Sequence, residues 1–350
     1  MFKKTAWICL YILIALVGME LVLRLAGWKE RIKLYEEIED QDVRWVHRAG
    51  FEGKLGNAQV MINSQGLRDR EYPFDKPAGT FRIFAVGECS TVGDYVALED
   101  SLVKRLEFML NKHKPFGKYG HYEVINGGLT EYDELQKLYF LKKYGLRYNP
   151  DLIIFSHDLS VKPWIEPRAN LRPVRLMLKK IPKQVYSIRY LLFNTMDIIE
   201  RSWNQFVFMQ GPLYNDLNKF CAKRYAGEGL RNSKIIPALK ELAALSRERR
   251  IPVLVVFMPW LDNLSEDKYS IQWVHELYAE ECRKNGLPLL DLYEACFKNK
   301  QPYLFWVDNS NRRPNTLAHW MAAKQVYREL TGKVFLPVIL KDHPLQDTVN

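Results

Sequence analysis

A thiol and a hydroxyl lie side by side in the turn Gly87–Ser90, where Cys89 and Ser90 follow the apolar run Phe81–Val86. In α/β hydrolytic proteins, a strand that ends in a glycine-flanked turn exposes a nucleophile. Such a nucleophile needs a base beside it, and usually a further group that orients the base. The turn is therefore the most promising site for acyl-transfer chemistry, and its partners must come from the elements around it.

Short apolar runs rich in β-branched residues alternate with helical patterns from this turn onward. The runs are Phe81–Val86, Tyr122–Asn126, Asp151–Ser156, Ile251–Phe257 and Leu287–Asp291. Between them, apolar residues recur with helical spacing at residues 102–110, 135–142, 235–245 and 274–278. This alternation predicts a parallel sheet with helices on both faces. We expect an α/β fold, a flavodoxin-like three-layer sandwich of about five parallel strands, with ligands bound at the carboxyl ends of the strands.

Four segments, in order along the chain, resemble the sequence blocks of the SGNH (GDSL) hydrolase family. They are Gly87–Ser90 for the first block, Val124–Gly128 for the second, Asp151–Asp158 for the third and Arg313–His319 for the end of the last. The similarity covers roughly residues 60 to 330. Residues 63–68 and the pair Glu20 and Arg24 are also similar to membrane-bound bacterial members. The resemblance implies an SGNH-like fold and an oxyanion hole formed by the amides of Cys89 and Gly128.

The departures from the family pattern lie at the catalytic positions. Cys89 stands where the family has serine, His157 where the third block has asparagine, and Arg313 where the last block has histidine. Ser310 then aligns with the aspartate of that block, with Asp308 nearby. In a second register, Asn311 takes the place of the histidine and Asp308 that of the aspartate. Neither register supplies a histidine.

The replaced histidine leaves few candidates for a base. Arg313 stays protonated at neutral pH and cannot accept a proton, although a nearby cation could hold Cys89 as a thiolate. His157 and His319 are the remaining local candidates, with His157 expected near Cys89 but poorly placed for the usual relay. Alternatively, Cys89 is a small buried residue in a tight turn, His157 a polar residue at a strand end, and His319 structural. Asp158 is expected to cap the segment that follows it.

The N-terminus predicts a membrane anchor. Lys3 and Lys4 precede an apolar run that extends to Gly27, interrupted by Glu20 and Arg24, and its length suits a membrane-spanning helix. Residues four apart can pair on one helix face. Lysines at the start should stay in the cytoplasm, which places the domain in the periplasm of a bacterium. We expect residues 5–27 to cross the inner membrane once; a cleaved signal peptide and a buried soluble helix are the alternatives.

The expected domain organisation follows from these elements. It comprises an anchor at 1–27, a charged juxtamembrane helix and lead-in at 28–80, an SGNH-like domain at 81–332, and a tail at 333–350. A basic helical insertion at about 159–232 interrupts the domain, with arginines and lysines alternating with apolar residues between 171 and 183. This insertion could cap a cleft, rest on lipid headgroups, dock a partner, or be a plain structural excursion.

The bulk composition limits which classes of partner and cofactor we expect. The net charge is +10 without a long run of like charge, and no nucleic-acid-binding motif is present, so we expect no nucleic-acid partner. None of the five cysteines forms a CxxC pair, and the histidines do not cluster, so we expect neither a metal nor a cofactor. Cys282 and Cys296 could form a disulfide in an oxidising compartment.

Two functions remain open. The first is a catalytically degenerate accessory or binding subunit at the membrane, whose partner is an envelope glycan or an integral membrane protein complex. The second is an atypical acyl esterase or acyltransferase on an envelope polysaccharide, with Cys89 as nucleophile, His157 or His319 as base, and the Cys89 amide with Gly128 as oxyanion hole. We prefer the first, because each catalytic group that is lost typically costs orders of magnitude in rate.

Overall fold

The computed structural model describes residues 2–26, 34–55, 58–130, 132–159, 234–309 and 311–332. It also describes residues 180–182, 185, 188, 190–192, 194–195, 221–222, 225–226 and 335. The predicted insertion at 159–232 and the tail at 333–350 therefore lie almost wholly outside the described residues. The chain forms two compact units, one of Met1–Trp45 with Pro163–Asn215 and one of Val46–Lys162 with Asp216–Asn350.

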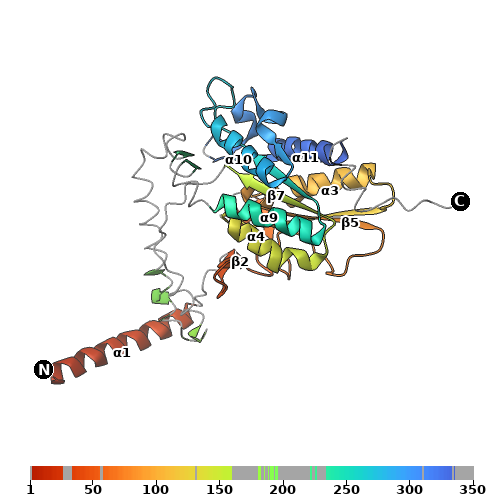
Figure 1. The fold of residues 1–350 in the computed structure, drawn as a ribbon. Helices are drawn as coiled ribbons and strands as arrows, with labels where there is room; N and C mark the ends of the chain where they lie inside the picture. Colours follow the sequence, from red (N-terminus) through yellow and green to blue (C-terminus); the bar gives the residue numbers. More distant parts are fainter. Residues whose placement is uncertain are drawn as a thin grey trace. The chain divides into compact units, whose positions relative to one another are not determined.

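In the first unit, helix α1 (Phe2–Leu25) coincides with the predicted anchor (Figure 1). Its Arg24 Nε lies 3.0 Å from Glu20 Oε1, the pair expected from their spacing. Large apolar side chains of α1 are widely exposed: Trp7, Ile8, Tyr11, Ile12, Leu13, Ile14, Val17, Leu21, Val22 and Leu25. Among the described residues, no helix combines the length and the apolarity that a membrane span requires. The membrane anchor therefore stays a prediction.

The prediction of a helix just after the anchor is wrong for the part of that segment that the structure describes. Residues Tyr35–Glu37 form strand β1, which pairs with β2 (Trp45–His47). The carboxylate of Asp40 accepts the N–H groups of Asp42 and Val43, each at 2.9 Å, and so closes the turn between the strands. Aspartate favours such turns through its own side chain, which outweighs the helical propensity of the charged run.

The second unit contains a parallel sheet in the order β6-β5-β7-β8-β9 (Figure 1). Its strands are β5 (Thr80–Gly87), β6 (His121–Gly128), β7 (Leu152–Asp158), β8 (Val253–Met258) and β9 (Leu289–Asp291). Every residue of β5, β7 and β8 is buried, as expected for strands covered on both faces. The five predicted strands and their flavodoxin-like layout are confirmed.

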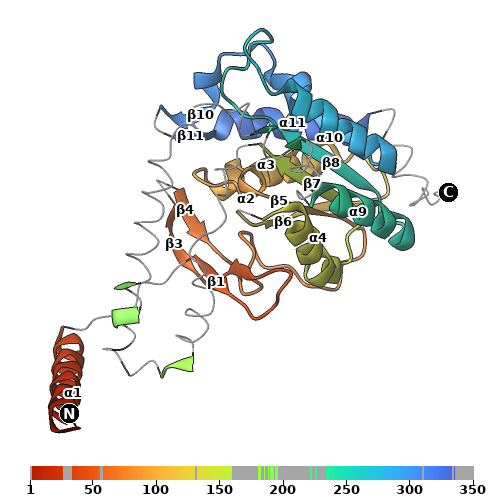
Figure 2. The same cartoon turned by 60° about the vertical axis from the view of Figure 1, so that its left-hand side comes forward.

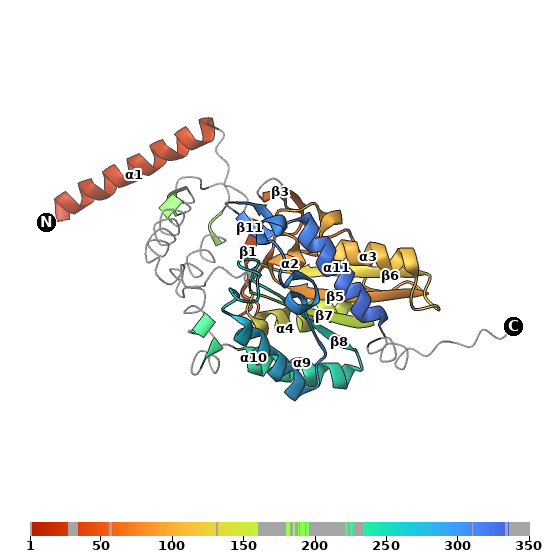
Figure 3. The same ribbon diagram turned by 90° about the horizontal axis from the view of Figure 1, so that it is seen from above.

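Helices cover both faces of this sheet (Figure 3). Helices α3 (Leu102–His113) and α11 (Thr316–Thr331) pack together on one face. On the other face, α9 (Ile235–Arg249) contacts both α4 (Glu134–Lys143) and α10 (Gln272–Asn285). The helical patterns predicted α3, α4, α9 and α10. Helix α11 was not among them, because it begins inside the last sequence block. Its N-cap residue is Asn315, whose side chain accepts a hydrogen bond from the Ala318 N–H at 3.1 Å.

Two hairpins and several short helices complete the second unit (Figure 2). The hairpins are β3 (Glu52–Leu55) with β4 (Ala58–Met61), and β10 (Trp306–Asp308) with β11 (Asn311–Pro314). The short helices are α2 (Cys89–Val92), η1 (Leu98–Asp100), η2 (Gly145–Tyr148), η4 (Tyr293–Phe297) and η5 (Pro302–Phe305). Helix α2 begins two residues after β5 ends, and it carries the candidate nucleophile.

The lead-in segment before β5 holds the chain that follows α2. The Arg68 guanidinium is buried and donates to the carbonyls of Val92, Gly93 and Val96 at 2.8, 2.6 and 2.7 Å. A buried cation is stable only when its donors are satisfied in this way. Residues 63–68, expected to be a turn-rich lead-in, therefore support the turn at the carboxyl end of β5.

Substitution of Arg68 tests this support. Arg68→Ala removes the guanidinium hydrogen bonds to three buried carbonyls, so it should lower the free energy of unfolding by roughly 2–4 kcal/mol in urea titrations. Arg283→Ala is the matched control: Arg283 is largely exposed and pairs only with its neighbours on α10, so its loss should cost less than about 1 kcal/mol. Equal effects of the two substitutions would contradict the role of Arg68.

Candidate functional site

Two glycines let α2 pack on the ends of the strands. Gly87 and Gly128 are register partners at the carboxyl ends of β5 and β6. A Cβ atom on Gly128 would lie 2.5 Å from the Val92 nitrogen and 2.9 Å from the Thr91 carbonyl carbon, both backbone atoms of α2. The glycines in the first and second blocks are therefore required by packing, whatever the chemistry.

Ser90 is fixed to Asp158 at the end of β7. Its N–H donates to Asp158 Oδ2 at 2.7 Å and its Oγ to Oδ1 at 2.5 Å, with both residues buried. The Asp158 carboxylate therefore holds the start of α2, and the segment that we expected it to cap lies outside the described residues from residue 160 onward. The hydroxyl of Ser90 serves this contact, which leaves Cys89 as the residue at the nucleophile position.

The environment of Cys89 keeps its thiol neutral. Cys89 is a free, buried cysteine. Burial is the main cause that raises its pKa well above the usual value, and the negative charge of Asp94 adds to it, while Arg313 opposes the shift. The interpretation that Arg313 holds Cys89 as a thiolate is therefore wrong, because desolvation of the sulfur outweighs the nearby cation.

Arg313 reaches the site from β11. Its Nη1 lies 3.2 Å from Asp94 Oδ2, and its guanidinium carbon lies 4.9 Å from the centre of the Tyr95 ring. Its positive charge lowers the pKa of Cys89, against the larger effect of burial. Asp308 is exposed, and its Oδ1 accepts the Asn311 N–H at 2.8 Å within the β10–β11 hairpin. The two residues of the second register thus stabilise a turn.

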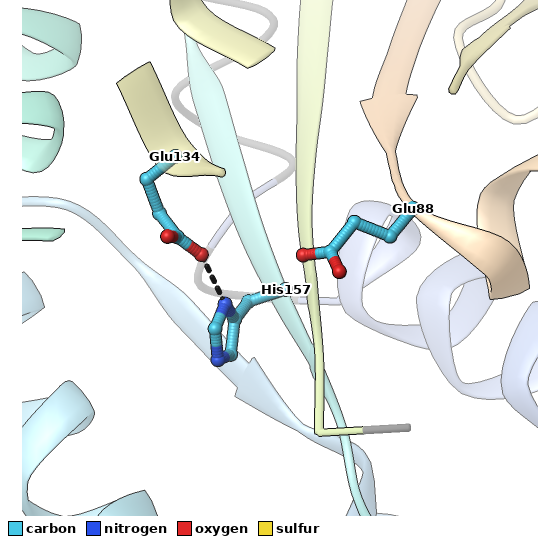
Figure 4. Close-up of side chains that lie close together, drawn as sticks. All are labelled: Glu88, Glu134 and His157. Atoms are coloured by element: carbon cyan, nitrogen blue, oxygen red, sulfur yellow. Dashed lines mark hydrogen bonds and ion pairs between the residues drawn. The ribbon is translucent and has the colours of Figure 1, made fainter. Parts of the chain in front are cut away.

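His157 faces away from the side of β7 that contacts α2 (Figure 4). Its Nδ1 is hydrogen-bonded to Glu134, and its Nε2 lies 3.3 Å from the Tyr225 hydroxyl. The ring stacks on Tyr278 with 4.6 Å between centroids. Since adjacent residues of a strand point to opposite faces, Asp158 meets Ser90 while His157 meets α4 and α10. The proposal of His157 as the base for Cys89 is therefore not supported.

His319 has a structural partner. Its Nδ1 accepts the Leu102 N–H at 3.2 Å, at the start of α3, and the ring is buried. Burial, and then the charge of Arg68, lower its pKa to about 3, so the ring is neutral. His319 therefore joins α11 to α3, and this contact occupies the nitrogen that a base would use.

The Gly128 amide is also occupied. It donates to Asn126 Oδ1 at 3.0 Å inside the buried end of β6. The Gly128 N–H, the second predicted donor of the oxyanion hole, is therefore directed into the protein, because Asn126 accepts a hydrogen bond from it. Sequence blocks show that a glycine is present but do not show where its N–H points.

A buried ion network lies beneath the turn, and sequence reasoning missed it. Lys137 Nζ lies 3.0 Å from Glu88 Oε1, 3.2 Å from Glu134 Oε1 and 2.9 Å from the Ser156 carbonyl oxygen. Burial opposes the charge of Lys137, but Glu134 and then Glu88 outweigh it, so its pKa is raised and the ammonium persists. The available signal was Glu88 within the turn together with Glu134 and Lys137 one helical turn apart.

The same residues resemble a metal site. Glu88, Glu134 and His157 each offer one ligand atom, and these atoms lie within 4.8 Å of one another (Figure 4). Two carboxylates and an imidazole are a plausible donor set for a transition metal. However, the Lys137 ammonium already lies within hydrogen-bond distance of both carboxylates and supplies the positive charge that they require. We therefore assign the cluster to ion pairing.

The disulfide considered between Cys282 and Cys296 is not formed. Both are free cysteines. Cys282 is buried on α10, and burial is the first cause that raises its pKa to about 12. These thiols therefore contribute to packing.

The ion network also makes a prediction about stability. Lys137→Ala leaves buried carboxylates without their cation and should lower the free energy of unfolding by roughly 3–5 kcal/mol. Lys142→Ala on the same helix is the matched control, because Lys142 pairs with Glu241 near the surface and should contribute less than about 1 kcal/mol. Urea unfolding followed by circular dichroism measures both, and a small effect at Lys137 would disprove the network's importance.

His319 makes a prediction about pH. Its folded-state pKa is about 3, below the ordinary 6.5, so between these values the unfolded chain binds a proton that the folded chain rejects. This contribution to stability is therefore present above pH 6.5 and is lost as the pH falls. His319→Gln, which can still accept the Leu102 N–H, should reduce the dependence of unfolding free energy on pH by about one proton in this window. An unchanged slope in urea titrations from pH 4 to 7 would contradict a buried, neutral His319.

The chain is similar in fold to solved GDSL and SGNH-type esterases. A lipase/acylhydrolase from Enterococcus faecalis is 14% identical, with 72% of this chain and 96% of that chain covered and a TM-score of 0.41. A lipolytic protein of the G-D-S-L family from Desulfitobacterium hafniense is 11% identical, with 71% and 98% covered and a TM-score of 0.38. A variant of an acetylxylan esterase from Geobacillus stearothermophilus is 10% identical, with 71% and 94% covered and a TM-score of 0.41.

The protein from Desulfitobacterium hafniense is described as a member of the G-D-S-L family, which the sequence blocks resemble. Identities and TM-scores of this size concern the fold alone and carry no argument about chemistry. No family model matches the sequence, and no curated protein matches it either.

Proposed function

We propose that this chain is a catalytically inactive SGNH-hydrolase-like protein that acts as a binding or accessory subunit at the bacterial inner membrane. The observation that carries the proposal is that neither of the two histidines predicted as a base for Cys89 is available to it. His157 and His319 both have partners inside the protein, and Arg313 cannot accept a proton. A neutral, buried thiol without a base is a poor nucleophile.

The other elements of an acyl-transfer site are also used elsewhere. Asp158 holds the start of α2 through Ser90, and Asn126 accepts a hydrogen bond from the Gly128 N–H. Oxyanion donors and general bases each contribute on the order of a hundredfold or more to the rate. Loss of both kinds of group disfavours the alternative, an acyl esterase or acyltransferase that uses Cys89.

The membrane part of the proposal is supported by the N-terminal segment. Helix α1 leaves apolar side chains exposed along its length, and lysines precede its apolar run. A helix that is apolar on every side favours a lipid environment. We propose that residues 5–27 cross the inner membrane and that the α/β domain works in the periplasm, with an envelope glycan or an integral membrane protein complex as partner.

A combined labelling and hydrolysis experiment tests the proposal. In full-length protein in mild detergent, Cys89 should react with iodoacetamide at pH 8 far more slowly than in urea, because burial raises its pKa. Mass spectrometry of the Cys89 peptide gives the rate. Hydrolysis of p-nitrophenyl acetate should be equal for wild type, Cys89→Ala and the control Cys282→Ala. Hydrolysis that Cys89→Ala alone abolishes would overturn the proposal and support the esterase.

A further inference from the structure

A cavity opens at the amino-terminal edge of the parallel sheet. Its volume is about 310 Å³, and its walls come from the connection that enters β7 and from the end of α9 with the connection to β8. Asn149 and Asp151 line the first wall, and Arg249 and Arg250 line the second. Since β5, β7 and β8 are parallel, this edge is opposite to the turn that carries Cys89. The cavity is therefore separate from the candidate hydrolase site.

Arg250 has a backbone conformation that favours glycine. It follows the last residue of α9 with the left-handed value φ 55, at a position where helices usually have glycine or asparagine. Cations near a helix end stabilise its dipole, but Arg247 and Arg249 in the last turn already supply them. Strain of this kind is often retained at sites that bind ligands.

The Arg250 guanidinium is available to a ligand. The side chain is exposed, and in the part of the chain that the structure describes it makes neither a hydrogen bond nor an ion pair. Packing within the domain therefore does not explain why a strained position carries an arginine. A ligand in the adjoining cavity would explain it, because the guanidinium is a lining group with all its donors unused.

The positive charge of this wall is poorly neutralised by the protein. Arg249 Nε lies 3.6 Å from Glu248 Oε1, but the two side chains are 58% and 72% exposed, and pairs of this kind contribute little. On the facing wall, the Asp151 carboxylate binds the Lys76 ammonium and accepts the Arg82 N–H at 2.7 Å. The charge of Asp151 is thus balanced from within the domain, and the cavity is positive.

These groups select an anion as the ligand. A cation would meet two guanidinium groups, and the acidic side chain of the lining already has its own cation. A guanidinium presents parallel N–H donors that match phosphate oxygens, and two of them suit a phosphate dianion better than a singly charged carboxylate. Leu146 and Ile251 add apolar surface to the lining, and the volume suits a small organic molecule.

We propose that Arg249 and Arg250, with Asn149 on the facing wall, form a site for a phosphomonoester carried by a small organic group. The guanidinium groups bind the phosphate oxygens, the Asn149 side-chain amide donates a further hydrogen bond, and Leu146 and Ile251 contact the organic part. Soluble phosphate esters and lipid headgroups both supply this chemistry. The site makes no use of Cys89, so it goes beyond the function proposed for the other edge of the sheet.

Phosphorus NMR with full-length protein in a nonionic detergent tests the site. One probe is glycerol 3-phosphate, a soluble phosphomonoester, and the other is dihexanoyl phosphatidic acid, a short-chain lipid with the same phosphate group. Titration of the phosphorus line width should give a Kd of about 1 mM or lower for at least one probe. Tighter binding of the lipid would identify a headgroup as the ligand, and tighter binding of glycerol 3-phosphate a soluble ester; each result supports the site.

Arg250→Gly and Arg249→Ala remove one guanidinium each. Either substitution should weaken binding by at least about tenfold, the loss expected for a hydrogen bond between charged groups. Arg250→Gly also relieves the left-handed backbone, so its Tm should not fall below that of wild type. A loss of binding in that variant therefore cannot be attributed to unfolding.

Arg247→Ala is the matched control, because Arg247 lies in the same last turn of α9 but does not line the cavity. It should bind the probes as wild type does, and an equal loss in this variant would overturn the proposal by showing attraction to the general charge of the helix end. The proposal also fails if neither probe binds at about 20 mM, well above a Kd of 1 mM. It fails as well if Arg250→Gly or Arg249→Ala binds as tightly as wild type.

Discussion

The Lys137 ammonium is buried, and a buried cation must be surrounded by paired acceptors. Meeting this requirement brings together Glu88 after β5, Glu134 on α4 and the end of β7. The Glu134 carboxylate, which pairs with Lys137, is also hydrogen-bonded to His157, so the imidazole belongs to the same network. One charge therefore holds together the side chains beneath the candidate site, and the imidazole of His157 shares its Glu134 partner.

The groups that would perform hydrolysis instead hold the fold together. Asp158 orients α2, the Gly128 amide is paired with Asn126, and His319 joins two helices. A donor or base that is already hydrogen-bonded inside the protein must break that bond before it can act on a substrate. The carboxyl edge of the sheet thus carries the sequence blocks of a hydrolase, while the candidate catalytic groups that the structure describes there are hydrogen-bonded within the protein.

The sequence predicted the elements better than the contacts. Buried parallel strands are long apolar runs, so β5 to β9 could be located, and the turn with Cys89 followed from the end of β5. The direction of His157 could not be predicted, because a shift of one residue in the strand end moves its ring to the other face. Lys137 was unexpected, because its position in the helical pattern does not reveal that the facing surface carries two glutamates. Residues 35–37 form a strand because the Asp40 turn outweighs their helical propensity.

The position of Arg68 moves the start of the folding unit upstream. A fragment cut at the predicted boundary, residue 81, would lack the guanidinium that binds three carbonyls after α2. It would also lack Asp69, whose carboxylate lies 2.8 Å from Lys104 Nζ on α3, and so would remove one of the two carboxylates that pair with this buried ammonium. The lead-in is therefore part of the folded domain, in agreement with a compact unit that begins at Val46.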